Sequence, residues 1–273
     1  MPTIQHDDVT LYYERKGQGV PVLLIQGVGV IGAGWGPQVE ALSADCDCLT
    51  FDNRGLGKSS AGNGPLSIQQ MAADALALMD AAGWQSAHVV GHSMGGVIAQ
   101  QLALDAPRRV KSLSLLCTFS SGAEGARPTP RVIWLGIRAR IGSPAMRRRA
   151  FLRMVFSQDY LNSLAIDDFA AKMAPVMGRD LAEQPPILMR QLKAMGAHDA
   201  SAQLHTFASI PTLVVSAEHD PIALPQYGRR LAQLIPGSRY HEIPNASHAI
   251  PLQDPAQINA LLHTHILQSE TRS

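Results

Sequence analysis

Ser93 lies in a segment whose residue types suit a nucleophilic serine. The segment Gly91-His92-Ser93-Met94-Gly95-Gly96 follows the apolar pair Val89 and Val90 and precedes a helix-forming run, 97–104. A Gly-x-Ser-x-Gly pattern between a strand and a helix is typical of a nucleophile elbow, in which the serine occupies a strained turn. The alternative, an ordinary nucleotide-binding turn, is disfavoured because neither of its glycine patterns occurs at this junction.

A serine hydroxyl attacks only with a base in hydrogen-bond reach, and the base needs an acid to hold its tautomer. Two predicted strand ends downstream of Ser93 supply these types, Asp220 and His248. We therefore predict a nucleophile, a general base and an orienting acid in the chain order Ser93, Asp220, His248. The alternatives are a turn-forming Asp220, with Glu218 as the acid, and a surface-loop histidine at 248.

A second glycine-rich turn, Gln26-Gly27-Val28-Gly29, follows an apolar run at residues 21–25. Glycines there let backbone N–H groups face a ligand. We predict that the N–H groups of Val28 and Met94 form an oxyanion hole, which stabilises the charge that develops during acyl transfer. The alternative is a flexible loop.

The remaining histidines and cysteines do not form a metal-ligand pattern. His92 is expected to point away from the cleft as a structural residue, and His263 and His265 fall on different faces of one predicted helix. The pair Cys46-x-Cys48 lacks a second cysteine or histidine pair. We predict neither a metal nor a cofactor.

The elements that must position these residues alternate between strands and helices. Such alternation at short spacing predicts an α/β fold with a mostly parallel sheet covered on both faces. Residues 4–16 read as an antiparallel hairpin at its edge. The predicted strands are 21–25, 48–51, 88–90, 110–117, 211–216 and 240–243, and the predicted helices are 38–44, 68–82, 97–104, 226–234 and 255–267.

The alternation of strands and helices stops between residues 120 and 206, where helical patterns interrupted by prolines replace the strands. We predict a helical cap there that covers the cleft, with residues 1–119 and 207–273 as the two parts of one core. Apolar side chains of the cap are candidates for the substrate pocket. These candidates are Trp134, Met154, Phe156, Met177 and Leu188.

The predicted cap is rich in arginine, with no acidic residue between Glu124 and Asp159. A solvated helix face is the favoured interpretation, and a rim that attracts anionic substrates is the alternative. The arginines are Arg127, Arg131, Arg138, Arg140, Arg147, Arg148, Arg149 and Arg153.

Bulk composition limits the function classes. The chain has 273 residues, 46% hydrophobic and 16% charged, with a formal net charge of +1. These values fit a globular protein that binds neither nucleic acid nor membrane. We see no signal-like start and no membrane-spanning run, so a cytoplasmic location is expected. Three cysteines fit reduced thiols, and a homo-oligomer is left open.

Taken together, the motifs resemble those of α/β-hydrolase fold enzymes over nearly the whole chain. They are the glycine turn at 26–29, the segment 52–59, the elbow at 91–96, Glu218-x-Asp220-Pro221 and Asn245-x-Ser247-His248. The resemblance implies an eight-stranded sheet with a helical cap after the sixth strand, the triad named above and no cofactor. One departure is Gln26, where many members have histidine. The layout is also similar to that of 3-oxoadipate enol-lactonases.

These expectations favour a serine hydrolase that cleaves a small to medium carboxylic ester or lactone through an acyl-enzyme. The alternative with the same triad is carbon–carbon bond hydrolysis of a dienoic diketone acid. A ligand receptor with little turnover is disfavoured because such proteins usually lack a triad member. The residues do not identify the substrate or its stereochemistry.

Overall fold

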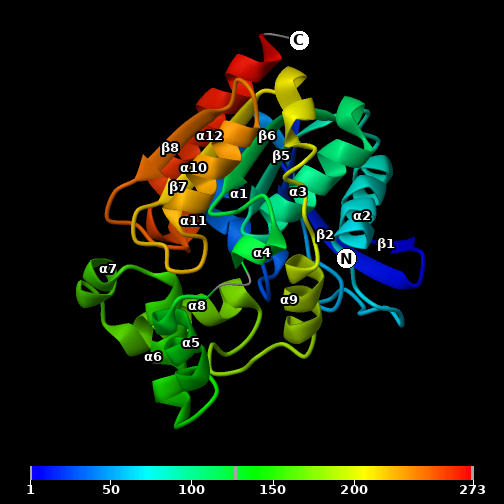
Figure 1. Ribbon diagram of the computed structural model, residues 1–273. Coiled ribbons are helices and arrows are strands. Elements are labelled where there is room, and N and C mark those ends of the chain that lie inside the picture. Colours follow the sequence, from blue (N-terminus) through cyan, green and yellow to red (C-terminus); the bar gives the residue numbers. More distant parts are fainter. Residues whose placement is uncertain (1, 126–127, 272–273) are drawn as a thin grey trace.

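The computed structural model describes residues 2–125 and 128–271, and its centre is one eight-stranded sheet (Figure 1). The strand order is β1-β2-β4-β3-β5-β6-β7-β8; β1 and β2 pair antiparallel, as do β2 and β4, and the other neighbours pair parallel. This confirms the predicted fold class. The strands are β1 (Thr3–His6), β2 (Val9–Lys16), β3 (Val20–Ile25), β4 (Cys46–Phe51), β5 (Ala87–His92), β6 (Val110–Leu116), β7 (Thr212–Ala217) and β8 (Arg239–Ile243).

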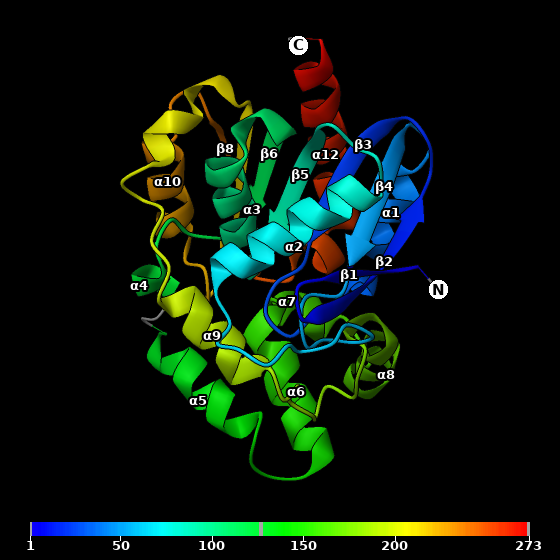
Figure 2. The same cartoon turned by 90° about the vertical axis from the view of Figure 1, so that its right-hand side faces the viewer.

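Helices cover both faces of the sheet (Figure 2). Helices α2 (Ile68–Ala81) and α3 (Met94–Asp105) pack together on one face, and α1 (Gly36–Leu42) and α12 (Pro255–Glu270) on the other. Because both faces are covered, the central strands read as continuous apolar runs. The remaining elements outside residues 120–206 are η1 (Gly32–Trp35), η2 (Pro107–Arg109), α10 (Pro225–Leu234) and α11 (Ile250–Gln253), and η3 (Leu204–Ser209) spans residue 206.

Residues 120–206, called the helical segment below, form no strand among the described residues and make only an isolated bridge between Ser121 and Asp199. Helices α5 to α8 lie together at one end of the sheet (Figure 1). Helices α6 to α8 share an apolar cluster that includes Leu152 and Phe169, and α5 packs on α6, where Leu135 and Ala150 belong to a second cluster. The helices are α4 (Gly122–Gly125), α5 (Pro130–Arg138), α6 (Pro144–Val155), α7 (Gln158–Asn162), α8 (Ile166–Met177) and α9 (Leu188–Gly196). The division into core and cap at residues 119 and 206 stays a prediction. None of the helices described here combines the length and apolar character needed to cross a membrane.

The loop after β4 forms hydrogen bonds with strand β2 and with the segment that follows β3. The carboxylate of Asp52 accepts hydrogen bonds from the backbone N–H of Gly32 (2.8 Å) and of Lys58 (2.9 Å). The Ser59 hydroxyl donates to Asp52 O (2.6 Å) and accepts from Tyr12 N (2.9 Å). This loop therefore links the loop after β3 to strand β2.

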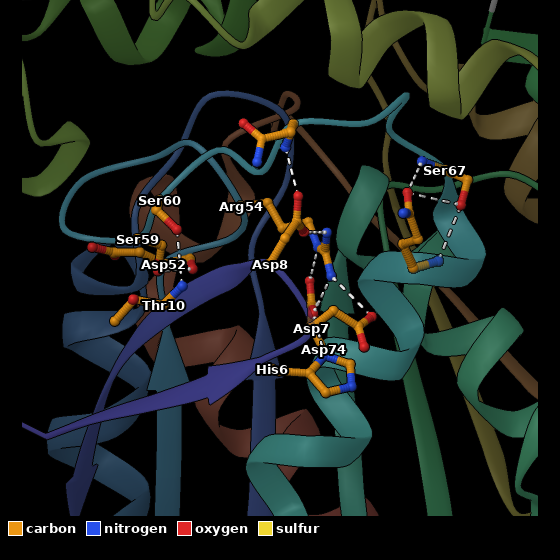
Figure 3. Close-up of polar contacts among 12 residues, drawn as sticks. His6, Asp7, Asp8, Thr10, Asp52, Arg54, Ser59, Ser60, Ser67 and Asp74 are labelled. Atoms are coloured by element: carbon orange, nitrogen blue, oxygen red, sulfur yellow. Dashed lines mark hydrogen bonds and ion pairs between the residues drawn. The ribbon is translucent and has the colours of Figure 1, made fainter.

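A buried ion pair fixes the same loop to α2 (Figure 3). The guanidinium of Arg54 binds both carboxylate oxygens of Asp74, with Nη2 2.8 Å from Oδ1, and both side chains are almost fully buried. His6 Nδ1 lies 2.7 Å from the same oxygen, Oδ1. The pair thus connects β1, the loop after β4 and α2.

Removing one member of this pair should destabilise the fold more than removing both. Arg54→Met leaves a buried carboxylate without its main partner, so we expect the free energy of unfolding in urea to fall by about 3 kcal/mol. The double variant Arg54→Met/Asp74→Leu should lose less than that. Arg149→Met, which breaks an exposed pair, should lose less than about 1 kcal/mol. A double variant that loses more than Arg54→Met alone would contradict this account.

Candidate active site

Ser93 occupies a sharp turn between β5 and α3. Its φ is 54° and its ψ is −120°, a conformation that costs a non-glycine residue about 1–3 kcal/mol. The turn is held by Ser93 N, which donates to Leu116 O (2.9 Å), and by Thr118 Oγ1, which donates to Ser93 O (2.7 Å). A Cβ on Gly95 would lie 2.0 Å from Ile25 O, so only glycine fits there. The sequence pattern predicted this geometry.

Asp220 and His248 form a buried pair on the turns that follow β7 and β8. His248 Nδ1 donates to Asp220 Oδ2 at 2.8 Å, and the two side chains are 9% and 0% exposed. The other carboxylate oxygen of Asp220 accepts from Ile222 N (2.8 Å) and Ala223 N (2.9 Å). With Nδ1 donating, the lone pair of neutral His248 is on Nε2, which is therefore the nitrogen able to accept a proton.

Glu218, the alternative acid, does not contact His248. Its carboxylate is about half exposed and accepts a hydrogen bond from Asn245 N at 2.9 Å. The structure therefore brings Asp220, and not Glu218, to the histidine.

His92 lies behind the pair and contacts its backbone. His92 Nε2 donates to His248 O at 2.8 Å, and the two ring centroids are 4.9 Å apart. Burial, with the nearby His248 as a second cause, lowers the pKa of His92 to about 3. His92 therefore stays neutral at ordinary pH.

Cys117 is a neighbour of the pair that we did not select from the sequence. Its thiol contacts Asp220, and burial raises its pKa well above the usual range. One donor atom each of Cys117, His92 and His248 lie within 4.8 Å of one another, the arrangement closest to a metal site among the described residues. However, His92 Nε2 and His248 Nδ1 are already engaged with protein oxygens. The donor set therefore does not favour a metal.

The turn after β3 lies against Ser93. A Cβ placed on Gly27 would be 3.0 Å from Ser93 Cβ and 3.5 Å from Ser93 Oγ. Gln26 Oε1, which stands where many members of the resembled family have histidine, accepts from Gly27 N at 3.3 Å. The turn carries Val28, and Met94 begins α3 directly after Ser93. The geometry thus places both candidate oxyanion donors in segments adjoining the serine.

Comparison with known proteins identifies the family of this chain. Residues 20–255 match the family described as the alpha/beta hydrolase fold. This chain belongs to the alpha/beta hydrolase family. It is similar to the putative carbamate hydrolase RutD of Azorhizobium caulinodans, with 31% identity, 96% of this chain and 97% of that protein covered. It is also similar to the rhodomycin D methylesterase DnrP of Streptomyces peucetius, with 32% identity, 97% of this chain and 98% of that protein covered.

Among solved structures, the enol-lactonase of Burkholderia xenovorans LB400 matches with a TM-score of 0.81 and 28% identity, over 97% of this chain and all of that one. This agrees with the resemblance to enol-lactonases that the layout suggested.

In this alpha/beta hydrolase three of the five candidate pocket residues share one apolar cluster, and the other two are not members of it. Phe156 and Met177 are buried in the apolar cluster of the helical segment, and Met154 packs against it. Trp134 on α5 is 56% exposed. Leu188 Cδ1 lies 3.8 Å from the position that a Cβ on Gly29 would take, next to the turn after β3. Their role in a pocket stays a prediction.

Two arginines of the helical segment are paired with acids. Arg148 binds Asp180 at 2.7 and 2.5 Å, and Arg149 binds Asp167 at 2.8 Å. These pairs favour the interpretation of a solvated face at these two positions. Arg127 lies outside the described residues.

The neutral state of buried His92 should appear in the pH dependence of stability. Its pKa is about 3 in the folded alpha/beta hydrolase and about 6.5 in the unfolded chain. The unfolded chain therefore binds an extra proton as the pH falls below 6.5, and the stability that is fully present above 6.5 is lost towards pH 3.

We expect the free energy of unfolding in urea to decrease between pH 7.5 and pH 5, and the decrease to be about 2 kcal/mol smaller in His92→Gln. His265 has its pKa lowered to about 4, also first by burial, and contributes in the same direction in both proteins. Equal decreases in the two proteins would show that His92 takes up a proton in the folded state.

Proposed function

We propose that this protein is a serine hydrolase that cleaves a small to medium carboxylic ester or lactone through an acyl-enzyme on Ser93. The observation that carries the proposal is the buried Asp220–His248 hydrogen bond of 2.8 Å, in a site whose serine occupies a strained turn. A buried carboxylate that fixes one imidazole nitrogen leaves the other free for proton transfer, which is the arrangement of a general base.

In the proposed reaction, Ser93 Oγ attacks the carbonyl carbon while His248 Nε2 takes its proton. The negative charge passes to the carbonyl oxygen, which accepts hydrogen bonds from the N–H groups of Val28 and Met94. The intermediate collapses, the carbon–oxygen bond breaks, and His248 returns the proton to the leaving alkoxide. Water, deprotonated by His248, then attacks the acyl-enzyme, releases the carboxylic acid and restores Ser93.

The class of substrate is supported by the names of the relatives, which include a methylesterase and an enol-lactonase. Hydrolysis of a carbon–carbon bond would use the same residue types. A panel of p-nitrophenyl esters, lactones and dienoic diketone acids, assayed with purified protein, separates the two reactions.

Ser93→Ala should abolish turnover and leave the fold intact. Loss of a triad member commonly lowers kcat by several orders of magnitude, so we expect at least a thousandfold decrease on the best ester of the panel. Ser163→Ala, an exposed serine of the helical segment, is the matched control and should keep full activity. Retention of more than about a tenth of the activity in Ser93→Ala would exclude Ser93 as the nucleophile.

Asp220→Asn should lower kcat far more than it changes KM. The amide can donate where the carboxylate accepts, so it would favour the wrong tautomer of His248 and would not stabilise the imidazolium. Glu218→Gln is the control and should be mild, because Glu218 contacts Asn245 N instead of His248. The opposite ranking of the two variants would assign the acid to Glu218.

A further inference from the structure

Two side chains of the helical segment form hydrogen bonds with the backbone of the turn after β3. Gln191 Oε1, on α9, accepts a hydrogen bond from Gly29 N at 2.9 Å. Arg179 Nη1, just after α8, donates to Gly29 O. Both polar groups of one residue in the turn are therefore bound by residues that lie about 150 positions further along the chain.

The Gln191 contact has one possible orientation. The side chain is fully buried, and its Nε2 has no hydrogen-bond partner in the part of the chain that the structure describes. Rotating the amide by 180° would turn its N–H donors against the N–H of Gly29, so the oxygen must face the turn. A buried, unpaired donor costs about 1–3 kcal/mol. A leucine at position 191 would avoid that cost but lose the bond to Gly29.

The guanidinium of Arg179 donates its hydrogen bonds to backbone carbonyl oxygens and not to a carboxylate. Besides Gly29 O it donates to Met177 O and Glu183 O, each at 3.2 Å. No carboxylate oxygen of the described residues lies within 4.0 Å of its guanidinium, and burial lowers its pKa. The charge thus strengthens bonds that tie Gly29 to the chain between α8 and α9.

Gly29, the residue bound by Gln191 and Arg179, adjoins the proposed oxyanion hole. Gly29 follows Val28 directly, and Gly27, on the other side of Val28, lies against Ser93. Pro185 and Leu188 pack against Gly29, within 3.2 and 3.8 Å of the place of a Cβ. A donor must lie within about 2.7–3.1 Å of the developing oxyanion, so a small shift of this turn weakens its bond to the transition state.

We propose that Gln191 and Arg179 are positioning residues that fix the Val28 N–H for transition-state stabilisation and so make the oxyanion hole depend on the helical segment. The inference rests on the proposed function of the same site. Neither residue is assigned contact with the reacting atoms.

The test compares Gln191→Leu and Arg179→Met with wild type on one ester. We expect kcat per active site to fall about ten- to a hundredfold in each variant, with KM changed less than about twofold. The affinity of an aryl trifluoromethyl ketone, which forms a tetrahedral adduct, should fall in the same proportion. Arg179→Lys, which keeps one cationic donor, should recover part of the loss. Arg149→Gln is the control arginine and should behave as wild type.

The double variant tests whether the two residues act on the same turn. If both act through Gly29, then Gln191→Leu/Arg179→Met should lose little more than the worse single variant. Independent structural damage would instead multiply the two losses.

Unchanged kcat and ketone affinity in the single variants, or losses confined to KM, would overturn the inference. Normalising to the sites titrated by a fluorophosphonate removes misfolded protein from the comparison, and Gln191→Met offers a second apolar replacement of similar length. Failure of the proposed function is distinguishable, because it would appear as an active Ser93→Ala variant whatever these variants do.

Discussion

The buried hydrogen bond between Asp220 and His248 sets the conditions for the rest of the site. A carboxylate with no exposed side-chain surface is stable only when its oxygens are bonded, and Asp220 has two backbone N–H groups and one imidazole N–H. These bonds require the turns after β7 and β8 to lie side by side, which the parallel pairing of the two strands provides. The direction of the imidazole, and hence of its basic nitrogen, follows from this arrangement.

The sheet brings the other parts to the same edge. Parallel strands place their carboxyl ends together, so the turns after β3, β5, β7 and β8 converge although they are far apart in the sequence. The strained conformation of Ser93 is sustained because β5 and α3 are packed on both sides of it. The helical segment completes the arrangement where Gly29 is held by Gln191 and Arg179, and where Ala249 N, next to His248, donates to Val155 O at 2.8 Å.

The sequence was most informative where local chemistry determines local structure. The run before Ser93, its glycines and the helix after it predicted the sharp turn. The alternation of strands with helices along the chain predicted the mostly parallel sheet. Burial on both faces of such a sheet leaves its central strands with a continuous apolar pattern. The proximity of Asp220 to His248 followed from their places after two strands of such a sheet.

The sequence was least informative in the helical segment. Trp134 is more than half exposed, and its predicted place in a pocket stays a prediction, because amphipathic periodicity does not say which face a helix turns to its neighbours. Gln191 and Arg179 carried no motif, since their contacts with Gly29 depend on how the segment packs on the core. The one feature of the sequence that could have pointed to Cys117 was its place at the end of the predicted strand 110–117. In the structure this strand, β6, pairs with β5, which leads to Ser93.

The central claim is that Ser93 is a nucleophile activated by His248. Intact-mass spectrometry after reaction with a fluorophosphonate, followed by peptide mapping, tests it most directly. The account predicts one adduct per chain on the peptide containing Ser93, no adduct in Ser93→Ala and much slower labelling in His248→Ala. An adduct on another residue, or labelling of His248→Ala at the wild-type rate, would contradict it.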